Sequence, residues 1–132
     1  MPETGAATRI TQVGTVIVTV SDQDQAVEFF TEKLGFEKRS DSAYGDGQRW
    51  VDVAPSGAST TIAVVPPMGE GSPGGETGIA FATEDIDADH ADLRDRGVDV
   101  DDEVMRMGSP VPPMFFFRDP DRNRYLIVGE PD

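Results

Sequence analysis

Apolar and polar residues alternate over residues 13–20, which is typical of a β-strand with two different faces. One face consists of Val16, Val18 and Val20, and the other of Thr15, Ile17 and Thr19. From about Gln23 to Lys33 the apolar spacing becomes helical, with Ser21 or Asp22 as the N-cap and Gly35 at the end. The buried stripe of this helix consists of Ala26, Phe29, Phe30 and Leu34.

Three further strands are predicted over 36–40, 49–54 and 60–65, separated by turns rich in Gly, Asp, Pro and Ser. The segment 66–75 that follows is rich in Pro and Gly, so we interpret it as a linker without regular structure.

The order of elements then starts again. A strand is predicted over 78–83, followed by a helix that Asp85 or Asp87 caps and that runs to Arg96 before Gly97. The residues expected to point inward from this helix are Ala88, Ala91 and Leu93. The last predicted strands span 103–107, 114–118 and 124–128.

The two halves form an internal repeat. Residues 16–22 align with 79–85 at an offset of 63, and Gly35-Phe36 aligns with Gly97-Val98 at an offset of 62. Each half is too small to bury its own sheet, so the halves should pack together or across a dimer. We expect a polar N-terminal segment (1–11) and one domain (12–130), with modules at about 12–65 and 76–130 joined by the linker 66–75.

Composition excludes several functional classes. The chain carries 25 acidic and 11 basic side chains, a net charge of −14, which argues against nucleic acid and anionic membrane surfaces as partners. The absence of cysteine excludes disulfides, zinc–thiolate sites, iron–sulfur clusters and thiol nucleophiles. No apolar run reaches the roughly 18 residues that span a bilayer, and no signal-peptide pattern is present, so we expect a cytoplasmic protein.

Several motifs together resemble the vicinal oxygen chelate superfamily, which contains glyoxalase I, extradiol dioxygenases, and the bleomycin and fosfomycin resistance proteins. These motifs are Val20-Ser21-Asp22 leading into 26–30, Leu34-Gly35-Phe36, 78–81 leading into 84–87, and Phe117-Arg118-Asp119-Pro120-Asp121-Arg122-Asn123. The last one is similar to an Asp-Pro-Asp-Gly-Asn turn, with Arg122 in place of Gly. The resemblance implies an α+β fold of two tandem β-α-β-β-β modules whose curled mixed sheets surround a cleft. It also implies a homodimer, because related proteins build clefts between chains.

The resemblance further implies where metal ligands lie in the metal-dependent members. The corresponding positions here are Thr15, Ala63, Gly78 and Leu126. None supplies a carboxylate or an imidazole, and a hydroxyl alone is a poor ligand for zinc, nickel or iron(II). The sequence therefore indicates the metal-free branch of the superfamily, with no metal and no cofactor.

The resemblance, supported by strand alternation, implies which residues line the ligand cleft. They are Thr15, Ile17, Trp50, Ala63, Gly78, Ala80, Phe116, Arg124 and Leu126. Alternation places Phe116 on the opposite face from Phe115 and Phe117, and the sequence leaves open which of the two faces is the cleft. Large aromatic side chains beside a cleft suit flat or cationic organic ligands, although ordinary core packing is an equal alternative.

Other chemically suggestive residues have ordinary structural explanations. His90, the single histidine, is expected to be a solvated helix residue, and the acids at 85–89 suit a helix start. Asp119-Pro120-Asp121 is expected to form a turn with Asn123 in a left-handed conformation. The arginines at 49, 118 and 124 are expected in surface ion pairs, with presentation of positive charge to a ligand as the alternative.

The leading functional hypothesis is binding of a small organic ligand, cationic or aromatic, in a metal-free apolar cleft, as in the bleomycin-resistance type. One alternative is a metal-dependent lyase or isomerase of the glyoxalase type, or a dioxygenase, with unrecognised metal ligands. A second is a non-catalytic structural or regulatory domain. No catalytic residue is assigned.

Overall fold

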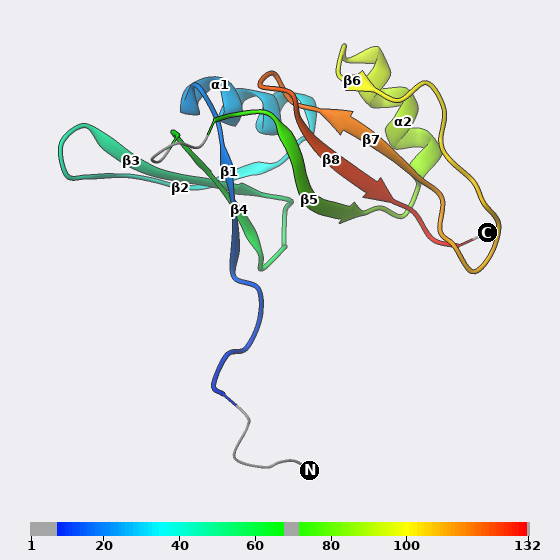
Figure 1. Cartoon of the computed structure of the whole chain (residues 1–132), viewed down its shortest axis with the longest axis horizontal. Coiled ribbons are helices and arrows are strands. Elements are labelled where there is room, and N and C mark those ends of the chain that lie inside the picture. Colours follow the sequence, from blue (N-terminus) through cyan, green and yellow to red (C-terminus); the bar gives the residue numbers. More distant parts are fainter. Residues whose placement is uncertain (1–7, 68–71, 132) are drawn as a thin grey trace.

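The two predicted modules lie side by side in the computed structural model, which describes residues 8–67 and 72–131 (Figure 1). The first module contains β1 (Thr15–Thr19), α1 (Gln23–Glu28), the π-helix η1 (Phe29–Lys33), β2 (Glu37–Tyr44), β3 (Gln48–Ala54) and β4 (Thr61–Val65). The second contains β5 (Gly75–Ala82), α2 (Ile86–Asp95), β6 (Asp99–Val100), β7 (Met114–Arg118) and β8 (Asn123–Val128). No helix within the described ranges is long and apolar enough to span a membrane.

Each module forms one mixed four-stranded sheet. Sheet A has the order β1-β4-β3-β2 and sheet B the order β5-β8-β7-β6. The first and last strands of each module pair in parallel, and the other neighbours are antiparallel. The α+β fold of tandem β-α-β-β-β modules is confirmed. β5 begins at Gly75, within the segment that the sequence assigns to the linker, and residues 68–71 of that segment lie outside the described residues.

The helix boundaries follow the predicted caps. Asp22 and Asp85 each accept a hydrogen bond from the backbone N–H three residues later, at 3.1 Å. Gly35 and Gly97 have φ angles of 74° and 81°, which glycine adopts without the steric cost of a Cβ. The first helix is not α-helical throughout, because its second half is the π-helix η1. A π turn holds one residue more than an α turn, so the first module has one residue more between its helix cap and Gly35 than the second has between its cap and Gly97. This accounts for the change in the offset between the two halves of the repeat from 63 to 62.

The predicted strand over 103–107 is wrong. The only pairing there is an isolated bridge between Met105 and Met114, and the strand next to β7 is β6, at Asp99–Val100. The Asp101 side chain explains this early end, because its Oδ2 accepts the Phe116 N–H at 3.0 Å. A side-chain oxygen thus occupies a donor of β7 beyond the end of β6.

The inward face of α2 also differs from the prediction. Ala88 and Ala91 are exposed, whereas Ile86 and Leu93 are buried. His90 is half-buried rather than solvated: its Nε2 lies 2.7 Å from the Asp101 carbonyl oxygen, and its ring meets Phe115 edge-on at 4.9 Å between centroids. His90 follows Ile86 by four residues and precedes Leu93 by three, so all three lie on the same side of the helix.

One hydrophobic core joins the modules. Phe29 of η1 stacks on Phe117 of β7 at 6.2 Å between ring centroids, and Phe30 meets Tyr125 of β8 edge-on at 5.7 Å. The ends of the two helices also exchange hydrogen bonds. Lys33 Nζ donates to the Arg96 carbonyl at 2.7 Å, and Arg96 Nη1 donates to the Lys33 carbonyl at 2.9 Å. Such reciprocal contacts are typical of two-fold symmetry.

The turn between β7 and β8 supplies the polar connection between the modules. The buried carboxylate of Asp119 accepts hydrogen bonds from the backbone N–H groups of Asp121 and Asn123, from Asn123 Nδ2, and from the Tyr125 hydroxyl. Asn123 Nδ2 also donates to the Thr19 carbonyl of β1 at 3.0 Å. This set of contacts fixes the last strand of module two against the first strand of module one.

The left-handed residue of this turn is Arg122, with φ of 68°, and not Asn123 as expected. Asn123 begins β8 instead, since its side chain is held between Asp119 and Thr19. Arg122 therefore carries the steric cost that a glycine at this position would avoid.

We expect Arg122→Gly to raise the free energy of unfolding by about 1 kcal/mol relative to Arg122→Ala, because both variants lose the same charge and only glycine relieves the left-handed backbone. Urea unfolding of the two variants measures the difference. A glycine variant no more stable than the alanine variant would contradict the assignment.

We expect Tyr125 to stay protonated until the protein unfolds, because burial and then the Asp119 charge raise the pKa of its phenol well above the ordinary value. A raised folded-state pKa gives stability that is complete below about pH 10, the unfolded value, and that is lost at higher pH. In a Tyr44→Phe background Tyr125 is the one remaining tyrosine. Its tyrosinate absorbance should then rise only together with the loss of far-UV circular dichroism. Ionisation of a still-folded protein would refute this assignment.

Candidate functional site

Each sheet has one side turned away from the core. In sheet A, residues of alternate parity such as Val18, Val53 and Val64 belong to the core cluster. We define face A as the opposite side of this sheet, which carries Thr15, Ile17, Ser40, Ser42, Tyr44, Trp50, Asp52 and Ala63. Face B is the corresponding side of sheet B and carries Glu76, Ala80, Phe116, Arg118, Arg124 and Leu126.

The structure places the predicted cleft residues in two groups. Ile17 is level with Ala63 on face A, and Trp50 lies on β3 of the same face. On face B, Ala80 is level with Leu126, which is level with Phe116. Gly78 lies where the β5 register shifts, with φ of 75°. Whether a ligand touches these residues stays a prediction.

A groove of about 490 Å³ joins the edges of the two sheets, β1 and β5. Of the predicted cleft residues, Ile17, Gly78 and Ala80 line it. A smaller cavity of about 230 Å³ lies on the core side, among residues such as Phe36, Phe81 and Leu93. Neither hollow includes Trp50, Phe116 or Arg124, which lie on the open surfaces of their sheets.

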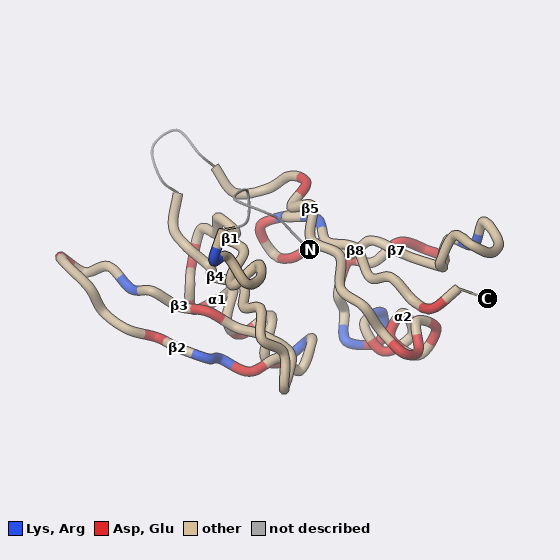
Figure 2. Tube along the Cα trace, turned by 90° about the horizontal axis from the view of Figure 1, so that it is seen from below, with Lys and Arg blue, Asp and Glu red and all other residues tan. Residues whose placement is uncertain are grey.

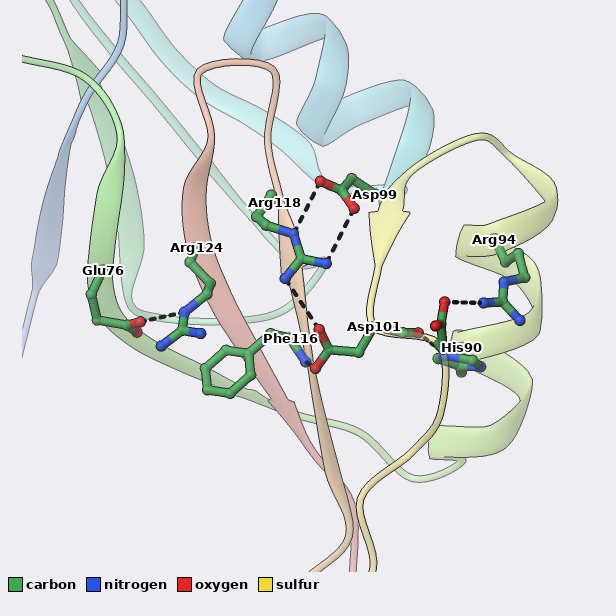
Figure 3. A network of polar contacts seen from close by, with 9 residues as sticks. Glu76, His90, Arg94, Asp99, Asp101, Phe116, Arg118 and Arg124 are labelled. Atoms are coloured by element: carbon green, nitrogen blue, oxygen red, sulfur yellow. Dashed lines mark hydrogen bonds and ion pairs between the residues drawn. The ribbon is translucent and has the colours of Figure 1, made fainter.

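The arginines of face B are held by acidic residues, as the sequence predicts (Figure 3). Arg118 Nε lies 3.0 Å from Asp99, and Arg118 Nη1 lies 3.1 Å from Asp101. The Arg118 guanidinium lowers the pKa of Asp99 below its ordinary value. Arg124 forms an ion pair with Glu76 and stacks over the Phe116 ring, with Cζ at 3.9 Å from the ring centroid. The positive charges of face B are therefore compensated within the chain.

Arg49 also forms the expected ion pairs, on the opposite side of sheet A from Trp50. Its guanidinium lies 2.7 Å from Asp41 and 3.0 Å from Asp24. Arg49 and Lys38 together lower the pKa of Asp41 to about 2. Figure 2 shows how widely acidic positions are distributed over both modules, so these few cations have acidic neighbours.

The sequence did not single out Asp52, which lies near the centre of face A. Its side chain is level with Ser40 on β2 and Ala63 on β4, and the residue is only 9% exposed. The signal was present, because Asp52 is two residues from Trp50 on one strand and must share its face. The sequence did not single out Tyr44 either, which lies close to Trp50 on the neighbouring strand of the same face.

The residues present do not fit the metal centre of the metal-dependent relatives. Thr15 has the single donor side chain among the four positions, and its Oγ1 is hydrogen-bonded to the Thr61 carbonyl at 3.1 Å and to Thr61 Oγ1 at 2.8 Å. Ala63, Gly78 and Leu126 offer no side-chain donor. Within 8–67 and 72–131, no three acidic or histidine side chains are grouped to hold a metal ion.

Comparisons with known proteins agree with this architecture. The family model described as Glyoxalase/Bleomycin resistance protein/Dioxygenase superfamily matches residues 10–127. The uncharacterized protein YetH of Bacillus subtilis (strain 168) is 36% identical over 121 residues, which cover 89% of this chain and 98% of YetH.

Two solved structures are similar throughout. A member of the same superfamily from Sphaerobacter thermophilus DSM 20745 has a TM-score of 0.86 and 37% identity, covering 92% of this chain and 98% of that one. TnmS3, described as an antibiotic binding protein from Streptomyces sp. CB03234, has a TM-score of 0.83 and 35% identity, covering 96% of this chain and 100% of its own.

Proposed function

The chain belongs to the glyoxalase/bleomycin resistance protein/dioxygenase superfamily, and on that premise we propose that it binds a small organic molecule, without a metal ion, in a cleft built from faces A and B. The observation that carries the proposal is that none of the four positions corresponding to metal ligands has a carboxylate or an imidazole, and that the one hydroxyl among them, of Thr15, is hydrogen-bonded to Thr61. Without donors for a divalent ion, the cleft has apolar and aromatic surface to offer instead.

The surface of the two faces supports this proposal. Ile17 is 55% exposed on face A, and Phe116 and Leu126 are half-buried on face B. Apolar side chains grouped on an open surface favour contact with a ligand or a partner. TnmS3, which is similar along its whole length, is described as an antibiotic binding protein. Sequestration of a toxic organic compound is the form of function that we propose.

We further propose that the chain acts as a homodimer in which a second copy brings its face B toward face A. Both faces lie opposite the core that the two sheets share, so on this proposal a partner closes the cleft from the other side. Binding rather than catalysis is favoured because His90, the chain's one imidazole, contacts Phe115 on the core side of sheet B, away from face B.

Protein purified without an affinity tag or chelator should contain far less than one metal ion per chain by elemental mass spectrometry. Added zinc, nickel, iron(II) or manganese should leave the thermal midpoint unchanged, since the described residues include no group of acidic or histidine side chains placed to bind them in the folded state. About one metal ion per chain would contradict the proposal and favour the glyoxalase or dioxygenase alternative.

Ile17→Asn should weaken the binding of metal-free bleomycin about tenfold, because it replaces apolar contact surface of face A by a polar amide and leaves the net charge unchanged. The quenching of Trp50 fluorescence measures this affinity, since Trp50 is the one tryptophan of the chain. Ile10→Asn is the matched control: Ile10 is 81% exposed and lies before β1. Equal affinities for the two variants, or no binding by the wild type, would count against the proposed cleft.

Sedimentation velocity tests the proposed homodimer and should give the mass of two chains for the wild type.

A further inference from the structure

Faces A and B differ in how their charges are balanced. On face B each arginine has an acidic partner, with Arg118 between Asp99 and Asp101 and Arg124 beside Glu76 (Figure 3). On face A the buried charge is the carboxylate of Asp52. Among the residues that the structure describes, no ion pair includes Asp52.

The Asp52 side chain has little polar contact within the chain. One oxygen, Oδ1, accepts a hydrogen bond from Ser40 Oγ at 2.8 Å. Within the described part of the chain, this is the one hydrogen bond of the Asp52 carboxylate. The other oxygen, Oδ2, accepts no hydrogen bond from the described residues, and it is not one of their buried unpartnered atoms, so it stays open to solvent. An open, unpaired carboxylate oxygen can meet a cation directly. Asp119, by contrast, already has four donors within the chain.

The surroundings of Asp52 favour a positive group over any other. Trp50 lies two residues away on the same face, and Tyr44 lies diagonally across from Trp50, because Ser42 pairs with Trp50 and Tyr44 with Gln48. The faces of indole and phenol rings attract cations, and that attraction grows where water is excluded. Among the residues that the structure describes, the cation–π contact is that of Arg124 with Phe116, and none of these residues places a cation over Trp50.

We propose that Asp52, Trp50 and Tyr44 form the recognition site for a cationic group of the ligand, an organic ammonium or guanidinium, with Asp52 as the counter-charge and the two rings as walls. This inference rests on the proposed function and specifies its ligand class. The net charge of −14 attracts such a ligand from a distance and repels anions. The neighbours of Asp52 in register, Ser40 and Ala63, are both small, and neither adds a competing charge.

Two probes of the same shape isolate the contribution of charge. The cation is para-hydroxyphenyl-trimethylammonium, and its neutral counterpart is para-tert-butylphenol, in which carbon replaces the nitrogen. Calorimetric titration of the wild-type protein should show tighter binding of the cation, by about tenfold or more. Equal affinity for both would overturn the cation site while leaving the proposed organic-ligand function intact. Failure to bind either probe would overturn both.

The variant Asp52→Asn keeps the size of the side chain and removes its charge. It should lose the preference for the cation and change the affinity for the neutral probe less than about twofold. Asp46→Asn is the matched control, because it removes the same charge from the exposed β2–β3 turn and should retain the preference. A preference that survives in Asp52→Asn, or that disappears equally in Asp46→Asn, would show that overall charge and not Asp52 selects the ligand.

A purely structural role for Asp52 predicts a different result. In that case Asp52→Asn would lower the thermal midpoint and weaken both probes equally, so the ratio of the two affinities would not change. Trp50→Leu, also titrated by calorimetry, should reduce the affinity for the cation more than for the neutral probe, because leucine keeps apolar contact and lacks the ring face. An equal loss for both probes would overturn the role of the ring.

Discussion

The buried carboxylate of Asp119 is the constraint on which the arrangement of the two modules depends. It gathers four donors from the β7–β8 turn and from Tyr125, and it thereby holds Asn123 where the amide reaches the Thr19 carbonyl of β1. Ser21 donates its backbone N–H and its hydroxyl to Asp121 of the same turn, at 3.0 Å and 2.6 Å. A fully bonded polar group in an apolar core permits one geometry and few others, so it fixes how sheet B lies against sheet A.

This fixed geometry decides what each sheet presents to the outside. The aromatic core around Phe29 and Phe117 uses one side of both sheets, which leaves faces A and B without cover from the helices. The charges on these faces are then balanced unequally. Face B compensates its arginines internally, while face A retains an acid beside two aromatic rings. This unequal balance is the basis for our proposal that face A receives a positively charged organic group.

Much of the fold could be predicted because it depends on local chemistry. The caps at Asp22 and Asp85, the glycines at 35 and 97, and the alternation that buries Phe117 and leaves Phe116 half-buried on the opposite face all follow from neighbouring residues. The errors arose where a distant partner intervened. The Asp101 side chain occupies a β7 donor beyond β6, Asn123 leaves the left-handed position to Arg122 because Thr19 and Asp119 hold its amide, and His90 is drawn inward by Phe115.

By itself the sequence determined the repeat, the order of strands and helices, the family, and the lack of carboxylates and imidazoles at the positions that correspond to metal ligands. Each of these is a matter of residue type and spacing along the chain. The tertiary structure alone decided which charges are compensated. Pairing between Arg118 and Asp99, or the absence of an ion pair at Asp52 among the described residues, depends on strands that meet only in the sheet. Spacing along a chain fixes the face on which a side chain lies, but its neighbours across the sheet decide whether its charge is satisfied there.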